Sequence, residues 1–408
     1  MPALNVFVPP APVPSLARFM GSVNHQFLLP RWCRIKDVHL AEDAELALQL
    51  DMHTGVPMFF TPNHPEYFAD WMLDKWLLDR VAPQMANWAD AAVVNGMGGV
   101  MQKFWLGNNI IAAVRGDDST KAIEHSIAWA VAGKGVLLHP EGSVNWDNEA
   151  VGPLFPGAAR MAVEAAKRHP SGKALLAPLA WYLRFRRDVT NALYAELADL
   201  DKRLQIGLPR GNPAQKMMFL VQTLIERVAE QFGMKLNSPR LTTYDPRERL
   251  FEVQAHANAA TIKHYRLLLD GDPHDSSLAQ TVRIARHLRQ TRHPLAVQDA
   301  TMLEALARLD ASVLSAATLT QEQVTHRLRR IRQDWVRGTA MDMVAKMAPR
   351  GLAARDAVIA VVPRLEVRGG DEPGSVTAAL QLAIEAGVQA ARGQAQEKFG
   401  PGRAYPVR

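Results

Sequence analysis

The sequence Val56-Pro57-Met58-Phe59-Phe60-Thr61 is a short apolar run, and Pro62-Asn63-His64 follows it directly. A second apolar run, Gly135–His139, leads in the same way into Pro140-Glu141-Gly142-Ser143. Further runs occur at 91–94, 109–114 and 174–180, and helical patterns lie between them at about 66–82, 97–106, 118–132 and 156–168. This alternation predicts an α/β fold, with a mostly parallel sheet flanked by helices.

Three polar residues follow the ends of expected strands: His64, Arg115 and Glu141. In open parallel sheets, ligands bind in the crevice beyond the carboxyl ends of the strands. The pattern therefore places all three residues along one rim of the sheet, where we expect the functional site.

Five blocks of the sequence, in order, resemble the motifs of the glycerolipid acyltransferase superfamily, which includes the lysophosphatidic acid acyltransferases. That family is marked by Asn-His-x4-Asp and Pro-Glu-Gly-Thr. The blocks here are Phe59–His64 with Asp70, Ile110–Asp117, Leu137–Ser143, Phe155–Ala162 and Leu175–Ala180, within about residues 35–185. The resemblance implies an O-acyltransferase that moves a fatty acyl group from acyl-CoA or acyl carrier protein to a hydroxyl of a lysophospholipid or related lysolipid.

His64 is the expected general base. Pro65 fits the first position of a helix, which would place His64 at or next to the N-cap. The positive end of the helix disfavours a protonated imidazole, so His64 should be neutral and able to accept a proton at about pH 7. A carboxylate would orient the ring, and the acceptor hydroxyl would attack the thioester of the donor without a covalent acyl-enzyme.

The residue that orients His64 is left open between Asp70 and Glu66. The family has its aspartate five positions after the histidine, where this chain has Ala69, and Asp70 comes one position later. One residue along a helix turns a side chain by about 100°. Either a bulged first turn lets Asp70 serve, or Glu66 takes the role, or the catalytic pair is altered.

The resemblance also implies a set of acceptor-binding residues: Asn63, Arg115, Gly116, Glu141, Gly142, Ser143 and Pro178. Arg115 is the expected ligand of an anionic headgroup, Gly142 would permit close approach, and Ser143 would supply a hydroxyl. Two positions depart from the family: Val144 stands where an arginine is frequent, and His139 replaces the usual aromatic residue. These departures favour a lysolipid other than a phosphomonoester, such as a phosphodiester or an amino-acid-headed lipid.

Composition restricts the partners. The 408 residues carry a net charge of +6 with a pI near 9.4, which suits phospholipid headgroups, coenzyme A or an acidic carrier protein. No zinc-finger spacing or aromatic-basic strand pattern indicates a nucleic-acid partner. The histidines show no metal-ligand spacing, so we expect no metal and no tightly bound cofactor.

Cysteine usage and hydropathy restrict the compartment. The single cysteine, Cys33, excludes an intrachain disulfide and suits a reducing environment. The N-terminus does not resemble a secretory signal, and no apolar run reaches the roughly 18 residues of a spanning helix. We therefore expect a cytoplasmic protein, or one that is peripheral on the inner membrane surface.

Four parts are expected along the chain: an N-terminal arm at 1–34, an acyltransferase domain at 35–200, a helical domain or insertion at 201–350, and a strand–helix segment with a tail at 351–408. Thr320-Gln321-Glu322-Gln323 is a capping-box pattern that predicts a helix start. Val358–Val367 predicts a strand that returns to the catalytic sheet, and Pro363 favours an edge position. The helical region would gate an acyl pocket, bind carrier protein or mediate self-association.

Three other functions are compatible with these residues. An acyltransferase of the same fold could use a non-glycerolipid acceptor. A displaced aspartate would suit a catalytically impaired protein that binds lipid or carrier protein. A lipid hydrolase would use His64 to activate water instead of a lipid hydroxyl.

Overall fold

The computed structural model describes residues 6–96, 98–113, 119–234, 245–269, 272–309, 311–336 and 348–407. The chain divides into two compact units. The sheet unit comprises residues 1–187 and 344–402, and the helical unit comprises residues 188–343 and 403–408. The boundary therefore falls at 188 rather than at the expected 201, and the end of the tail belongs to the helical unit.

The sheet unit contains one eight-stranded sheet in the part of the chain that the structure describes. Its strands follow the order β1-β8-β6-β2-β5-β3-β4, and β9 also pairs with β6. The bounds are β1 Ile35–His39, β2 Met58–Pro62, β3 Ala86–Asp90, β4 Ile110–Ala113, β5 Val136–Leu137, β6 Lys173–Phe185, β8 Arg355–Val361 and β9 Leu365–Arg368. β8 and β9 run antiparallel to β6, whereas the other pairs are parallel, so the predicted mostly parallel α/β sheet is confirmed.

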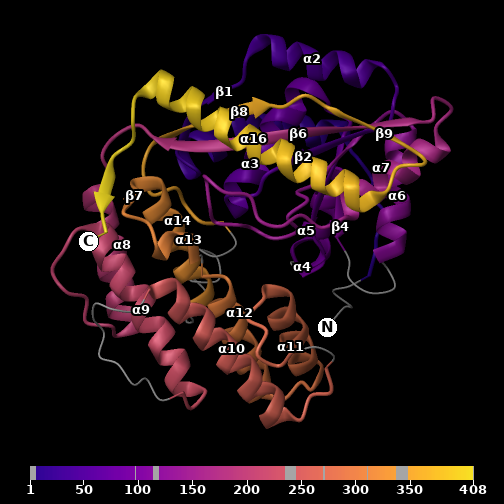
Figure 1. Cartoon of the computed structure of the whole chain (residues 1–408). Helices are drawn as coiled ribbons and strands as arrows, with labels where there is room; N and C mark the ends of the chain where they lie inside the picture. The colour runs from indigo at the N-terminus through magenta and orange to yellow at the C-terminus, as the bar shows by residue number, and fades with distance from the viewer. Residues whose placement is uncertain are drawn as a thin grey trace. The chain divides into compact units, whose positions relative to one another are not determined.

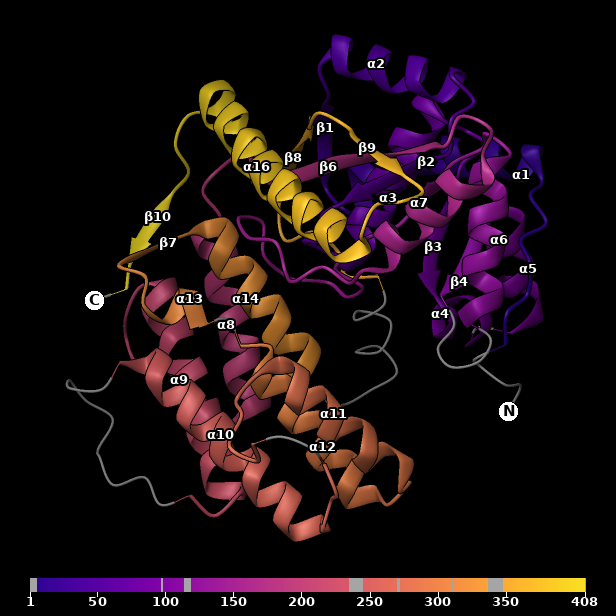
Figure 2. The ribbon, with the colours of Figure 1, turned by 45° about the vertical axis from the view of Figure 1, so that its right-hand side comes forward.

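Helices cover both faces of this sheet (Figures 1 and 2). The long helix α16 lies across β6 and β8 on one face, and α6 and α7 pack on the same side. The opposite face carries α3, with η1 and α2. The bounds are α2 Glu42–His53, α3 Tyr67–Val81, α4 Ala91–Gly96, α5 Gly99–Gly107, α6 Ser119–Val131, α7 Gly157–Arg168 and α16 Pro373–Phe399, with the π-helix η1 at Asn24–Trp32.

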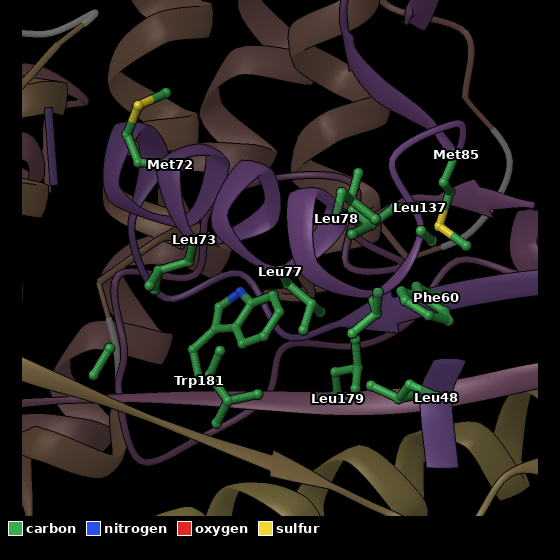
Figure 3. Packing of buried hydrophobic residues seen from close by; sticks show 14 of the residues in the cluster. Leu48, Phe60, Met72, Leu73, Leu77, Leu78, Met85, Leu137, Leu179 and Trp181 are labelled. Carbon is green, nitrogen blue, oxygen red and sulfur yellow. The ribbon is translucent and has the colours of Figure 1, made fainter. Parts of the chain in front are cut away.

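Successive residues of β6 face opposite sides of the sheet, as the period of a strand requires. Leu179 and Trp181 pack against α3, whereas Ala180 packs against α16. Figure 3 shows the Trp181 ring beneath Leu73 and Leu77 of α3. Burial on both faces explains why β6 is an almost continuous apolar run.

Two prolines lie where β6 changes its antiparallel partner from β9 to β8. β6 pairs with β9 up to Leu176 and with β8 from Leu179. Pro178 lies between these two pairings, and Pro363 lies between β8 and β9. A proline has no N–H to donate to a strand ladder. Both prolines lie in the gap between the β6–β9 and β6–β8 ladders, where no such bond is needed. The edge position expected near Pro363 applies to β9, because β8 lies between β1 and β6 inside the sheet.

One strand lies elsewhere than expected. The apolar run Ala91–Val94 belongs to α4, and the strand before it is β3. Short apolar runs cannot be assigned to a strand or a helix by pattern alone. The polar residues Asn87 and Asp90 conceal β3 in the sequence, although Asn87 is buried and donates to Asp74 at 3.1 Å.

The N-terminal segment folds onto the sheet unit instead of forming a separate arm. Its first helix, α1 (Pro14–Val23), and η1 both pack on α3. Asn24 is fully buried, and its side chain donates to the Met72 carbonyl of α3 at 2.8 Å. The N–H of Val13 also donates to the Gly107 carbonyl at 2.8 Å.

In its described residues, the helical unit contains helices α8 to α14 and a pairing of β7 with β10. The bounds are α8 Thr190–Leu204, α9 Pro213–Gln231, α10 Pro246–Tyr265, α11 Leu278–Gln290, α12 Pro294–Ala307, α13 Ala311–Leu314, β7 Thr318–Thr320, α14 Gln321–Trp335 and β10 Ala404–Pro406. The predicted capping box of α14 is confirmed: Thr320 and Gln323 each accept the other's backbone N–H through their side chains. Among the described helices of either unit, none is long and apolar enough to cross a bilayer.

Candidate active site

The carboxyl ends of β2 and β5 bring two of the expected residues to one rim. These strands are adjacent and parallel, with Phe60 opposite Leu137. His64 follows β2 and Glu141 follows β5, so the turns that carry them are neighbours. Arg115 and Gly116, expected on the same rim after β4, lie outside the described residues.

The start of α3 sets the position of Asp70. The helix begins at Tyr67 with Glu66 as its N-cap, so Pro65 lies before the helix rather than at its first position. Glu66 is extended, with φ −141° and ψ 147°. The extended Glu66 takes up the extra position in the sequence, and the first turn of α3 then presents Asp70 to the histidine.

His64 and Asp70 form a hydrogen-bonded pair. His64 Nδ1 lies 2.8 Å from Asp70 Oδ2, and the same oxygen accepts the backbone N–H of Glu66 at 2.7 Å. Asp70 is fully buried, whereas the His64 side chain is 15% exposed. Since Asp70 holds the Nδ1 hydrogen, Nε2 is the ring nitrogen that can take a proton from a substrate.

Glu66 forms a buried ion pair with Arg355. Arg355 Nη1 lies 2.5 Å from Glu66 Oε1, and Nη2 lies 2.7 Å from Oε2. Arg355 is the first residue of β8, and its Nε donates to the Cys33 carbonyl at 3.1 Å. The structure therefore places Asp70, and not Glu66, at the ring of His64.

The surroundings of Asp70 raise the proton affinity of its carboxylate. Burial raises the pKa of Asp70 well above its usual value, and the charges of Glu66 and Asp74 act in the same direction. The Glu66 N–H and the Arg355 guanidinium oppose the shift. Because Asp70 and His64 share a hydrogen bond, they titrate as a pair, and the pair gains a proton at a higher pH than an isolated carboxylate would.

A second histidine–aspartate pair lies directly beside the first. The His139 ring stacks on the His64 ring, with centroids 4.1 Å apart and an interplanar angle of 18°. His139 Nε2 lies 3.0 Å from Asp74 Oδ2, and Nδ1 lies 2.9 Å from the Asn63 carbonyl oxygen. Asp74 follows Asp70 by one turn on the buried face of α3.

Two asparagines bind the backbone of β6 beyond the end of β2. Asn63 donates to the Trp181 carbonyl at 3.2 Å and accepts the Trp181 N–H at 2.7 Å. Asn148 makes the same two bonds to Leu183, at 2.7 and 2.9 Å. The Asn63 amide is therefore committed to β6, and it anchors the His64 turn instead of binding an acceptor as expected.

Glu141 fastens the loop after β5 to the turn that carries His64. Its Oε1 accepts the His64 N–H at 2.6 Å, and its Oε2 accepts the Gly152 N–H at 2.7 Å. The Asn145 N–H, in the same loop, donates to the His64 carbonyl at 2.8 Å. Glu141 is only 4% exposed, so the structure gives it a role in holding the His64 backbone rather than the expected contact with an acceptor.

The titration of Glu141 should make the protein less stable as the pH rises. Burial raises the pKa of Glu141 from 4.5 to about 7, although the N–H groups of Gly152 and His64 oppose the shift. Between these two values the folded protein keeps a proton that the unfolded chain releases, so stability falls with increasing pH. We expect the free energy of unfolding in urea to drop by up to about 3 kcal/mol across this window.

The Glu141→Gln variant provides the control for that measurement. It removes the titrating group, so its free energy of unfolding should depend less steeply on pH than that of the wild type, whatever its absolute stability. Equal slopes in the two proteins would mean that Glu141 is already ionised in the folded state throughout the window.

The remaining expected acceptor residues lie in different settings. Gly142 has a φ of +64°, and a Cβ there would lie 2.8 Å from the Phe155 ring, so this turn requires glycine. Ser143 is exposed beside it. Pro178 is buried within β6 rather than at the rim.

One cluster of possible metal ligands lies away from these residues. Asp37, His39 and Asp356 bring ligand atoms within 4.8 Å of one another. Arg186 already contacts both carboxylates, and Lys398 Nζ lies 2.9 Å from His39 Nδ1. These cations compete with a metal ion for the same atoms, so the cluster is a network of ion pairs and hydrogen bonds.

Sequence reasoning missed Asp74, Asn148 and Arg355 as parts of the site. Asp74 has a detectable signal, because it lies one turn after Asp70 on a helix face that is otherwise apolar. Asn148 and Arg355 have none, because their partners lie far away in the sequence.

No family model and no curated protein matches this sequence. The contacts described above all join residues of the sheet unit.

Proposed function

We propose that the protein is an O-acyltransferase. It would move a fatty acyl group from acyl-CoA or acyl carrier protein to a hydroxyl of a lysophospholipid or related lysolipid. The observation that carries the proposal is the His64–Asp70 pair at the carboxyl end of β2, with Nδ1 and Oδ2 2.8 Å apart. A histidine held by a buried carboxylate is the arrangement that general-base activation of a hydroxyl requires.

In the proposed reaction, His64 Nε2 takes the proton of the acceptor hydroxyl while the hydroxyl oxygen attacks the thioester carbonyl. The tetrahedral intermediate then collapses, the C–S bond breaks, and the new ester and a thiolate are formed. The imidazolium returns its proton to the thiolate. Asp70 stabilises the charged ring between these steps and ends in its starting state.

The position of Asp70 supports catalysis over a binding role alone. The displacement of this residue by one position would favour an impaired protein if it left the imidazole without a carboxylate. Because Glu66 is extended and α3 begins at Tyr67, the carboxylate of Asp70 still reaches His64 Nδ1.

Sequence features support the proposed class of substrates. The order of the five acyltransferase-like blocks favours a lipid acceptor, and the net charge of +6 suits an anionic headgroup or an anionic donor. Val144 stands where a second phosphate-binding arginine would be expected. The proposed acceptor therefore carries a headgroup other than a phosphomonoester.

The test is an acyl-transfer assay with defined donors and acceptors. Purified wild-type protein would receive palmitoyl-CoA, with and without each member of a panel of lysolipids, and the products would be identified by mass. The series would be repeated with palmitoyl-loaded acyl carrier protein. We expect thiol release and a diacyl product that both depend on one class of lysolipid.

Other results would favour the other functions. Free fatty acid released without any acceptor would indicate a hydrolase that activates water. Thiol release that depends on a non-glycerolipid hydroxyl would support the same acyl-transfer chemistry with a different class of acceptor. No turnover with either donor would favour a lipid- or carrier-binding protein.

A further inference from the structure

The two ring nitrogens of His139 both face hydrogen-bond acceptors. Nδ1 lies 2.9 Å from the Asn63 carbonyl oxygen, and Nε2 lies 3.0 Å from Asp74 Oδ2. A carbonyl oxygen and an ionised carboxylate accept hydrogen bonds and do not donate them. With Asp74 ionised, each bond requires a hydrogen on its nitrogen, and an imidazole that carries both hydrogens is an imidazolium.

Titratable groups face His139 from three elements. Asp74 lies on α3, His64 lies in the turn after β2, and Glu141 lies in the loop after β5. Burial lowers the pKa of His139, but Asp74, a backbone carbonyl and Glu141 outweigh it and hold the value above the usual one. The charge balance around the ring thus agrees with its hydrogen-bond pattern.

We propose that His139 is a positioning residue for His64: an imidazolium, held by Asp74, that stacks on the neutral ring of His64. The catalytic meaning of this proposal rests on the proposed acyltransferase function. The charge state of His139 does not, and it can be measured without any reaction.

A charged ring in this stack changes the proton affinity of His64 in two ways. The positive charge of His139 offsets the negative charge of Asp74. Of the two carboxylates, Asp70 and Asp74, only Asp70 then raises the proton affinity of His64. The charged ring also repels a second positive charge on a ring whose centroid is 4.1 Å away. His64 is therefore kept neutral before the reaction, and the proton that it takes from the hydroxyl passes readily to the leaving thiolate.

An uncharged aromatic residue at this position would stack on His64 without these effects. It would also leave the buried Asp74 with Asn87 Nδ2, at 3.1 Å, as its remaining donor among the described residues. Burying a charge without a charged or well-bonded partner is costly. His139 and Asp74 therefore act as a unit.

The charge state can be measured by NMR. The histidines would be labelled with ¹⁵N, and the ring signals would be assigned with the His139→Phe and His64→Ala variants. At about pH 7 we expect hydrogens on both nitrogens of His139 and on one nitrogen of His64. A wild-type His139 with a single ring hydrogen at this pH would overturn the proposal.

Three variants separate the charge of His139 from its shape. His139→Phe keeps an aromatic ring in the stack but leaves the Asp74 carboxylate, so the midpoint of the His64 titration should rise by about one pH unit. The double variant His139→Phe/Asp74→Asn removes both charges and should return the midpoint toward the wild-type value. A midpoint that His139→Phe leaves unchanged would mean that the ring acts by packing alone.

Asp74→Asn decides the question if His139→Phe does not fold. It removes the carboxylate that holds the imidazolium, so His139 should lose one ring hydrogen at about pH 7. If His139 kept both hydrogens in this variant, Asp74 would not be the group that holds them, and the proposal would fail.

The activity assay then separates this inference from the proposed function. In an active enzyme, the acid limb of the kcat/KM profile should shift with the His64 midpoint in His139→Phe and return in the double variant. A protein without transferase activity would refute the proposed function, whereas the NMR results would still decide the charge state of His139.

Discussion

We expect the His64→Ala variant to transfer acyl groups about 100- to 10,000-fold more slowly than the wild type, because the general base is lost. The fold should survive the change. The bonds that fasten this turn use the His64 backbone, whose N–H donates to Glu141 and whose carbonyl accepts from Asn145. The measurement is kcat/KM for the best donor and acceptor, together with the urea midpoint of each protein.

Two further variants define what the loss of activity means. His53→Ala removes an exposed histidine at the end of α2 and should leave the rate unchanged. Asp70→Asn keeps the shape of the side chain but cannot stabilise an imidazolium, so it should also lower kcat/KM, on the order of 100-fold. A His64→Ala protein that kept more than about a tenth of the wild-type rate would rule out the general-base mechanism.

Breaking the Glu66–Arg355 ion pair should cost about 3–5 kcal/mol of stability, whichever partner is removed. The two side chains are only 3% and 4% exposed, and they meet through two parallel N–H···O contacts. Removing one partner leaves the other charge buried without its ion-pair partner. Arg355→Met and Glu66→Gln would be compared with the wild type by urea unfolding, followed by tryptophan fluorescence.

Matched variants test whether burial is the cause. Glu66→Met/Arg355→Met removes both charges and should recover much of the loss, because well-packed apolar residues replace buried ion pairs at little cost. Glu366→Gln breaks exposed pairs with Lys173 and Arg368 and should change stability by less than about 1 kcal/mol. A similar small cost for Arg355→Met would show that water reaches the buried pair.

The alternation of strands and helices predicts most of the sheet because the buried parallel strands are continuous apolar runs. The pattern does not predict β3, because Asn87 and Asp90 interrupt its apolar run. Asn87 is buried through its bond to Asp74, which lies on another element. The length of β6 also exceeds the expectation. Its second half runs past the end of β2. On that side Asn63 and Asn148 bind the β6 backbone, and on the other side β8 pairs with it.

The site could be predicted in position but not in its contacts. The strand ends place His64 and Glu141 on one rim, whereas the reach of Asp70 depends on a single extended residue before α3. Glu141 was expected to face a ligand, yet its carboxylate accepts backbone N–H groups from two loops. Such partners are set by tertiary packing, which local sequence patterns do not encode.

The asparagines that bind β6 have a consequence for association between copies of the chain. A strand that outruns its neighbour leaves backbone donors and acceptors that a strand from another molecule can pair with, which is a route to domain swapping and aggregation. Asn63 and Asn148 fill these positions at Trp181 and Leu183 with side-chain amides. The same residues that hold the loops of the candidate site thus also occupy the backbone groups of β6 that another strand would need for pairing.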